Sequence, residues 1–142
     1  MKLKSKFLVI AYTLVATALV FSCDAQVSKG SSRIAPGMIK VAILYPNEEG
    51  KTFNMDYYSQ KHMPMAARLF GDSLKAMSID KGLANGTPGS PIPYLAIGYF
   101  YFENMASCQS IMSQHSAKLR ADVANYTNVK PVILISEVIK VE

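Results

Sequence analysis

The sequence predicts an α+β domain whose elements follow the order βαββαβ, and three observations support this prediction. Four short runs are rich in β-branched and aromatic residues, and two longer segments place apolar residues at helical spacing. An asparagine that can cap a helix precedes each helical segment. Turn-forming residues separate the elements. This order is that of the ferredoxin-like fold, in which two βαβ units share one four-stranded sheet.

The first strand and the first helix follow residue 37. Residues 38–45, MIKVAILY, are typical of a strand, and turn residues close them. Asn54 can cap a helix that runs to about Phe70. Pro64 lies inside this helix and removes one of its backbone hydrogen bonds, so we expect a kink or a broken turn directly after His62.

Two further strands with a loop between them follow. Residues 73–81 alternate loosely and predict the second strand, with Leu74, Ala76 or Met77, and Ile79 facing inward. Residues 83–93 contain three prolines and two glycines and must form a loop. Residues 94–102, YLAIGYFYF, predict the clearest strand of the chain. Gly98 lies in its middle, and a bulge or tight packing explains this glycine more readily than a ligand does.

The second helix and the last strand complete the domain. Asn104 can cap a helix that ends at about Ala121. Its predicted buried stripe consists of Met105, Cys108, Ile111, Met112, His115 and Leu119. Residues 132–141 predict a strand whose first four residues have no polar face, which indicates that both of its faces are covered. Helices would cover one face and a second subunit the other, so we expect a homodimer.

Residues 1–22 are typical of a signal peptide of the lipoprotein type. Three lysines precede an apolar run from residue 7 to residue 21, which is short for a membrane-spanning helix of ~20 residues. The run ends in VFSC, which resembles a bacterial lipoprotein cleavage site with Cys23 as the lipidated first residue of the mature protein. We therefore expect export and a lipid anchor at the cell envelope. A periplasmic or secreted protein, or an uncleaved anchor, is the alternative.

The remaining residues divide into a linker and a domain. Residues 23–37 are small and polar and predict a flexible linker, and residues 38–142 form the domain. The formal net charge is +5, but from residue 38 onward ten Lys and Arg stand against nine Asp and Glu. Without a basic stripe, nucleic acid is not expected as a partner. Cys23 and Cys108 are the two cysteines, which excludes a disulfide framework and leaves Cys108 as a core residue.

Tyr58 and His62 are the strongest candidates for catalysis. Residues four apart on a helix are neighbours, and a phenol beside an imidazole can share a proton or bind a polar ligand. A partly exposed histidine near a helix end is the structural alternative. His115 lies on the apolar stripe, where a hydrogen-bonded core histidine is the more common situation. Both helices should cover the same face of the sheet, however, so His115 and His62 could approach one pocket.

The sequence indicates neither a metal site nor a bound cofactor. Two histidines without a spaced third ligand fall short of the usual three or four metal ligands. No phosphate-binding loop, dinucleotide fingerprint or serine nucleophile motif is present. Asn125, Tyr126 and Thr127 precede the last strand, and by themselves they predict a turn.

Four separated motifs resemble the EthD family. They are NMDYYSQKHMP at residues 54–64, DKG at 80–82, GSPIPY at 89–94 and NYTNVKP at 125–131, and the resemblance extends from residue 38 to about residue 141. It implies a ferredoxin-like domain that pairs into a dimeric α/β barrel. It also places His62 at the family's H-x-P position and makes Asn125, Tyr126 and Thr127 a segment that contacts a ligand.

The family's usual biochemical label is oxidoreductase, which would require an external electron carrier here. Our leading hypothesis is a homodimer that acts on a small, largely apolar carbonyl or aromatic compound, by acid/base chemistry without a cofactor or as an oxidoreductase component. The alternative is a non-catalytic small-molecule binding protein at the cell envelope. Haem is a further alternative by analogy with other dimeric α/β barrels, with His62 or His115 as its ligand.

Overall fold

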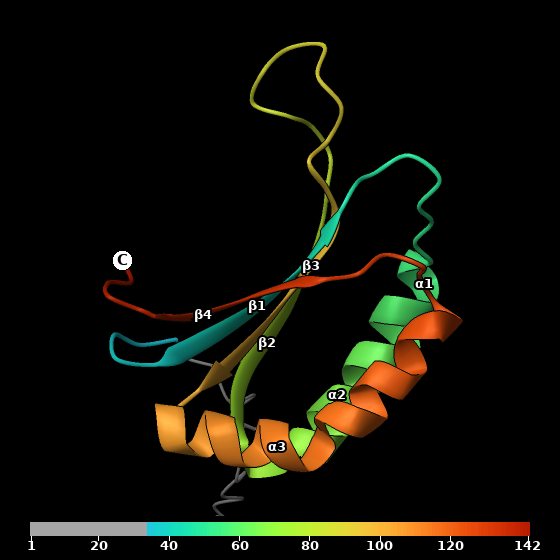
Figure 1. Ribbon diagram of the computed structural model, residues 1–142. Helices are drawn as coiled ribbons and strands as arrows, with labels where there is room; N and C mark the ends of the chain where they lie inside the picture. Colours follow the sequence, from blue (N-terminus) through green and yellow to red (C-terminus); the bar gives the residue numbers. More distant parts are fainter. Residues whose placement is uncertain (1–33) are drawn as a thin grey trace, which may run out of the picture. The chain divides into compact units, whose positions relative to one another are not determined.

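Four antiparallel strands form one sheet in the computed structural model, which describes residues 34–142 (Figure 1). The strands are β1 (Ile39–Pro46), β2 (Leu74–Lys81), β3 (Tyr94–Phe102) and β4 (Val132–Glu137), and their order across the sheet is β2-β3-β1-β4. The helices α1 (Met55–Tyr57), α2 (Met63–Phe70) and α3 (Met105–Asp122) lie on one face of this sheet (Figure 1). The predicted α+β, ferredoxin-like fold is confirmed.

The N-terminal predictions concern residues that are not described. The signal peptide, Cys23 and most of the predicted linker lie outside residues 34–142. Within the described part of the chain, no helix combines the length and the apolar character that crossing a membrane requires.

The first helical segment is irregular, but not where the sequence predicted. Asn54 caps it as expected, because its side chain accepts a hydrogen bond from the Tyr57 amide at 3.0 Å. A π-helical turn then spans Tyr58–His62, so the irregularity ends at His62, whereas the sequence predicted it directly after His62. Pro64 lies in the first turn of α2, directly after the π-helical turn. The predicted kink position is therefore corrected by one turn.

The register of β2 and the end of β4 are each determined by the neighbouring strand. The pairing of β2 with β3 shifts between Leu74 and Ala76, so that Leu74 and Met77 pack against the core although they are three residues apart. This bulge explains the loose alternation in the sequence. The last strand ends at Glu137 rather than at residue 141, because its partner β1 begins opposite Glu137 at Ile39.

The helix α3 begins and ends close to its predicted limits. The Asn104 side chain accepts a hydrogen bond from the Ser107 amide at 2.9 Å, which confirms the cap. Cys108 is buried, as predicted, and burial raises the pKa of its thiol. Met105 is 40% exposed, which corrects its place in the buried stripe. Helical spacing identifies the side of a helix that faces the sheet, but it does not say how far the sheet extends opposite the first turn.

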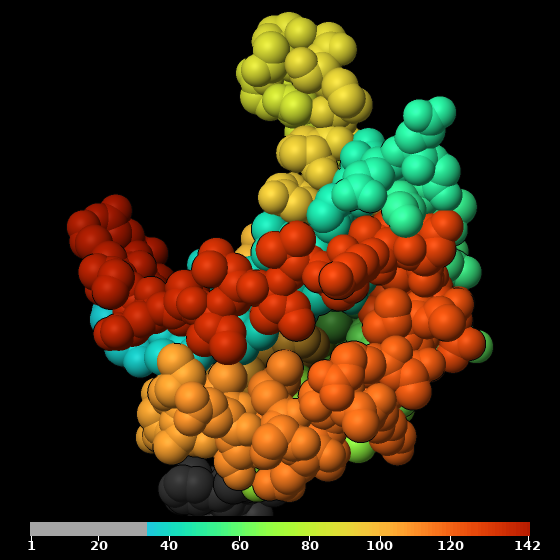
Figure 2. Space-filling view, in the orientation of Figure 1, coloured from blue at the N-terminus to red at the C-terminus, as the bar shows by residue number. Residues whose placement is uncertain are grey.

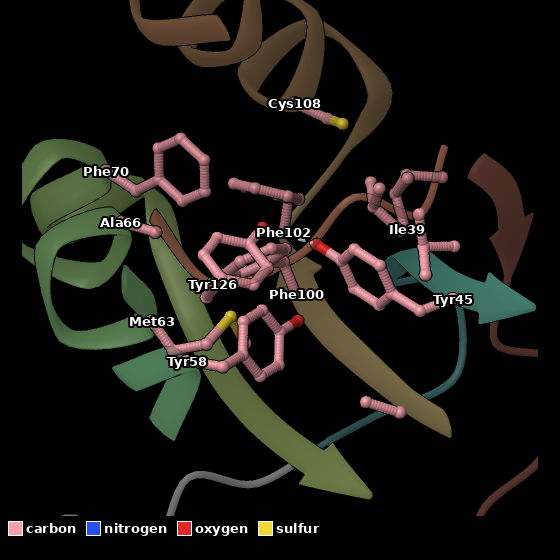
Figure 3. Packing of buried hydrophobic residues seen from close by; sticks show 13 residues of the cluster. Ile39, Tyr45, Tyr58, Met63, Ala66, Phe70, Phe100, Phe102, Cys108 and Tyr126 are labelled. Carbon is pink, nitrogen blue, oxygen red and sulfur yellow. Dashed lines mark hydrogen bonds between the residues drawn. The ribbon is translucent and has the colours of Figure 1, made fainter. Parts of the chain in front are cut away.

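The core lies between the helices and the sheet (Figure 3). Phe70 from α2 packs against Phe100 and Phe102 of β3, with ring centroids 5.2 Å and 5.6 Å apart. These aromatic contacts attach α2 to the centre of the sheet. They also fix the position of the π-helical turn that precedes α2 in the chain.

Gly98 allows Tyr58 to lie directly against the sheet. A Cβ atom at residue 98 would overlap the Tyr58 hydroxyl and would lie 3.1 Å from Met63 Cε. The glycine is buried, and its φ angle is not positive. Tight packing, rather than a special backbone conformation, therefore requires glycine at this position.

Candidate functional site

A cavity of about 130 Å³ lies between the helices and the start of β4. Six of the residues that line it carry a polar or charged group: Tyr45, Tyr58, His62, Ser116, Arg120 and Tyr126. The other eight are apolar, and they include Ile133 of β4 and Leu119 of α3. In Figure 2 the surface is hollowed between the orange α3 and the red β4, from which these two residues come. The cavity is therefore an apolar space with a few polar groups, as is usual for small-molecule sites.

His62 is buried at the wall of this cavity and is held by a carboxylate. Its Nδ1 atom lies 2.8 Å from Oδ2 of Asp122, and the histidine is only 6% exposed. An ionised carboxylate can only accept a hydrogen bond, so Nδ1 of His62 donates. In the neutral ring, Nε2 then carries a lone pair that can accept a hydrogen bond or a proton. The contact with Asp122 thus fixes both the ring orientation and the tautomer.

Asp122 is the centre of a hydrogen-bond network. Its Oδ1 atom accepts hydrogen bonds from the Tyr57 hydroxyl at 3.0 Å and from the Asn125 amide at 2.8 Å. Desolvation by itself would raise the pKa of Asp122, but the hydrogen bonds from His62, Asn125 and Tyr57 and the charge of His62 outweigh it and lower the pKa. Asp122 is therefore ionised at neutral pH. The hydrogen bond between the Tyr57 hydroxyl and Asp122 raises the pKa of Tyr57.

Two tyrosine hydroxyls continue the network from His62 into the core. The Tyr126 hydroxyl lies 3.4 Å from Nε2 of His62 and 2.7 Å from the Tyr45 hydroxyl. Figure 3 shows Tyr45 reaching from β1 toward Tyr126. Burial raises the pKa of Tyr45 and of Tyr126, so both stay protonated at neutral pH. Protonated phenols can donate hydrogen bonds to an oxygen on a ligand, which a phenolate cannot do.

Tyr58 packs against His62, but its hydroxyl does not donate a hydrogen bond to the imidazole. The two rings are stacked with centroids 5.6 Å apart and planes 17° apart. The Tyr58 hydroxyl is buried and has no hydrogen-bond partner among residues 34–142. Burial raises the pKa of this phenol strongly. The contribution of Tyr58 visible in the structure is a flat wall beside the imidazole.

The other predicted site residues occupy different positions. His115 is half-buried beside Phe70, with ring centroids 6.5 Å apart, and it does not line the cavity with His62. Asn125 does not line the cavity, and its amide donates a hydrogen bond to Asp122. The Thr127 hydroxyl donates a hydrogen bond to the Thr52 carbonyl at 2.7 Å and so joins two loops. Of the three residues predicted to contact a ligand, only Tyr126 lines the cavity.

The residues present do not fit a haem group. Pockets for molecules of that size measure about 300 to 1,000 Å³, whereas the cavity beside His62 has a volume of about 130 Å³ within one chain. His115 lies outside this cavity. Between residues 34 and 142, no three histidine, cysteine or carboxylate side chains gather closely enough to hold a metal ion.

Asp122 and Tyr45 are the site residues that the sequence analysis missed. Asp122 is a single carboxylate in the last turn of a helix, where most such residues face solvent. Tyr45 did leave a signal, because it shares the alternation of β1 with the buried Val41. A tyrosine on the inward face of a strand must place its hydroxyl near another polar group.

Replacement of Asp122 by asparagine should lower the free energy of unfolding by an amount on the order of 1 kcal/mol near neutral pH. The native state lowers the Asp122 pKa from 3.8, so its stabilisation is complete above that value. It is lost as the pH falls below 3.8 through the native pKa. Urea unfolding of the parent protein and of Asp122→Asn, near neutral pH and at about pH 3, measures the difference in stability at each pH. A stability difference that grows toward acid pH would contradict the assignment.

Comparison with known proteins agrees with the fold. Residues 50–130, more than half of the chain, match the EthD domain family. The chain is similar to the crystal structure of an EthD-like protein from Ralstonia eutropha JMP134, with 37% sequence identity and a TM-score of 0.70 over 75% of this chain and 96% of that one. It shares its fold with an ethyl tert-butyl ether D (EthD) family protein from Bacillus halodurans C-125, at 18% identity and a TM-score of 0.51 over 72% of this chain and 99% of that one. No curated protein matches it. The chain therefore belongs to the EthD family.

Proposed function

We propose that this EthD-family protein is an acid/base enzyme that acts on small, largely apolar carbonyl or aromatic compounds without a cofactor. The observation that supports this proposal is the contact of 2.8 Å between His62 Nδ1 and Asp122, in a histidine that lines an apolar cavity. A carboxylate in this position orients an imidazole and stabilises it when it takes up a proton. An oxidoreductase role, by contrast, would require an electron carrier supplied from outside.

The size of the cavity limits the substrate. An apolar protein cavity of about 150 Å³ accommodates benzene, and the cavity here measures about 130 Å³. The substrate portion that it encloses is therefore about as large as one six-membered ring or a short branched chain. A carbonyl group on such a body can accept a hydrogen bond from Tyr126 or Tyr45, whose hydroxyls stay protonated.

The proposed reaction is proton abstraction from a carbon next to a carbonyl group. His62 Nε2 removes the proton, and the electron pair of the broken C–H bond moves into the carbonyl group to form an enolate. A tyrosine hydroxyl donates a hydrogen bond to the enolate oxygen as negative charge develops there. Asp122 stabilises the imidazolium that has formed. Return of a proton from Nε2 to the substrate completes the cycle.

Proton exchange provides a test that needs no knowledge of the natural substrate. Acetophenone, propiophenone and cyclohexanone are incubated with the protein in deuterated buffer, and loss of the proton signal next to the carbonyl is followed by NMR. The proposal predicts exchange that is faster than in buffer alone and proportional to the protein concentration. Absence of catalysed exchange for ketones that demonstrably bind would sink the enzymatic proposal.

A non-catalytic binding protein is the second candidate. It is favoured by the lining of the cavity, in which eight of the residues are apolar and the Tyr58 hydroxyl has no partner among residues 34–142. Such a protein needs shape and apolar contact rather than proton transfer. Ligand affinity that survives the combined change Tyr58→Phe and His62→Gln, without any product from the parent protein, would favour this candidate.

We further propose that the protein functions as a homodimer through its sheet. Val132, Ile133, Leu134 and Ile135 of β4 are between 47% and 56% exposed in the single chain. Monomeric soluble proteins seldom leave such a run of large apolar side chains in water. A second copy is the occupant with matching apolar chemistry, as expected from the sequence.

Leu134→Glu should convert the dimer to a monomer or an insoluble chain. Leu134 lies opposite Ala42 in the sheet, and a buried carboxylate at a subunit contact costs several kcal/mol. Sedimentation equilibrium measures the mass of the variant. Gln109→Glu adds the same charge at an exposed position of α3 and serves as the control. A Leu134→Glu protein with the mass of a dimer would show that the interface lies elsewhere.

A further inference from the structure

We propose that the natural ligand of this cavity is a single-ring carboxylic acid or a close analogue, whose anionic group pairs with Arg120. This inference rests on the proposed function for the location of the site, and it extends that proposal by naming the charge of the substrate. It arises from one side chain that the acid/base mechanism does not use. That side chain carries a permanent positive charge and belongs to a residue that lines the apolar space.

Arg120 lines the cavity from the last turn of α3. Ser116, one turn earlier on the same helix, lines it as well, so this face of α3 offers two groups that donate hydrogen bonds. Apart from His62, Arg120 is the only lining residue with an ionisable charge of either sign at neutral pH. The electrostatic preference of the cavity therefore depends on Arg120 and on the ionised Asp122 that contacts His62.

The positive charge of Arg120 is not neutralised by the described part of the protein. The ion pairs within residues 34–142 are His62–Asp122, Lys75–Glu103 and Lys140–Glu142, and Arg120 belongs to none of them. Asp122 is close to Arg120 in sequence, but its carboxylate accepts hydrogen bonds from three other side chains. The guanidinium group is thus available to a carboxylate, which it can bind with two parallel hydrogen bonds.

The helix dipole alone does not explain why Arg120 lies at the cavity. A basic side chain near a helix C-terminus complements the helix dipole, but it can do so from any side of the helix. Lys118 is two residues away and exposed, and it does not line the cavity. Of these two basic residues near the end of α3, only Arg120 contributes to the lining of the cavity.

The cavity and the charge together describe a ligand with two parts. A space of about 130 Å³ accepts one ring, and the lining is largely apolar. Arg120 is an exposed residue, which places a bound carboxylate at the solvent side of this space. A second polar group on the ring, a carbonyl or a hydroxyl, would then approach His62 and Tyr126 from inside.

Binding of benzoate and benzamide tests the inference directly. These probes share size and shape and differ in charge, and their dissociation constants are measured by titration calorimetry with the parent protein, Arg120→Gln and Lys118→Gln. The parent should bind benzoate roughly 2- to 5-fold more tightly than benzamide, the usual effect of an ion pair at an exposed side chain. Arg120→Gln should abolish this preference, and Lys118→Gln, which removes the same charge, should retain it.

Three results would overturn the inference: equal affinity of the parent for the two probes, a benzoate preference that persists in Arg120→Gln, or no benzoate binding at millimolar concentration. Thermal unfolding verifies that each variant is folded. The assay needs no turnover, so its outcome is independent of the exchange of neutral ketones that tests the proposed function. A benzoate preference without catalysed exchange would retain the ligand class and reject the enzyme.

Discussion

Replacement of His62 by glutamine should slow the catalysed exchange of ketone protons by about 100- to 10,000-fold, the usual contribution of a general base. Glutamine has a similar size and can donate a hydrogen bond to Asp122, but it cannot accept and return a proton near neutral pH. It is preferable to alanine, because His62 is buried between the rings of Tyr58 and Tyr126. Exchange rates measured by NMR over a range of ketone concentrations give the loss.

His115→Gln is the matched control for this experiment. It removes the other histidine of the chain, which lies beside Phe70 and outside the cavity. Exchange by this variant should equal that of the parent. If both histidine variants lose activity to the same extent, the role assigned to His62 cannot stand, and a contribution of His115 from a second site must be considered.

Gly98→Ala should destabilise the protein by about 1 to 3 kcal/mol, the usual cost of overpacking a core. The new methyl group would overlap the Tyr58 hydroxyl and press on Met63. Both neighbours lie in the helical segment that covers β3, so neither can move without disturbing His62 or α2. For a domain of this size the change lowers the melting temperature by about 4–8 °C per kcal/mol. Thermal and urea unfolding provide the measurement.

Tyr58→Phe identifies the cause of this destabilisation. By itself it removes a buried hydroxyl that has no partner among residues 34–142, so it should leave stability unchanged or increase it. In the Tyr58→Phe protein, Gly98→Ala should cost much less than in the parent, because the overlapping oxygen is gone. Equal cost in the two proteins would mean that the backbone, rather than the hydroxyl, requires glycine at this position.

The parts of the fold that local sequence determines were predicted well. The limits of β3 are exact, and both asparagine caps are present at Asn54 and Asn104. The errors concern features that depend on residues far away in the chain. The end of β4 is set by Ile39, and Met105 is exposed in the first turn of α3. Periodicity in one segment holds no information about either.

The candidate site was predicted in part, for a related reason. Helical spacing placed Tyr58 beside His62, because four residues define one turn. The partner that orients His62 is Asp122, which is 60 residues away in the sequence. No spacing rule connects these two residues. Only the packing of the π-helical turn against the end of α3 brings the carboxylate to the imidazole.

Ile133 links ligand binding to the concentration of the protein itself. It lines the cavity and is also 56% exposed on the edge strand β4. Anything that covers β4 therefore changes the water around a wall of the cavity. If a second copy occupies this edge and strengthens ligand binding by excluding water from this wall, linkage requires that a bound ligand strengthen association by the same factor. The Leu134→Glu protein should then show weaker ligand affinity together with its smaller mass, so that a cell could adjust occupancy of the cavity through the abundance of the protein.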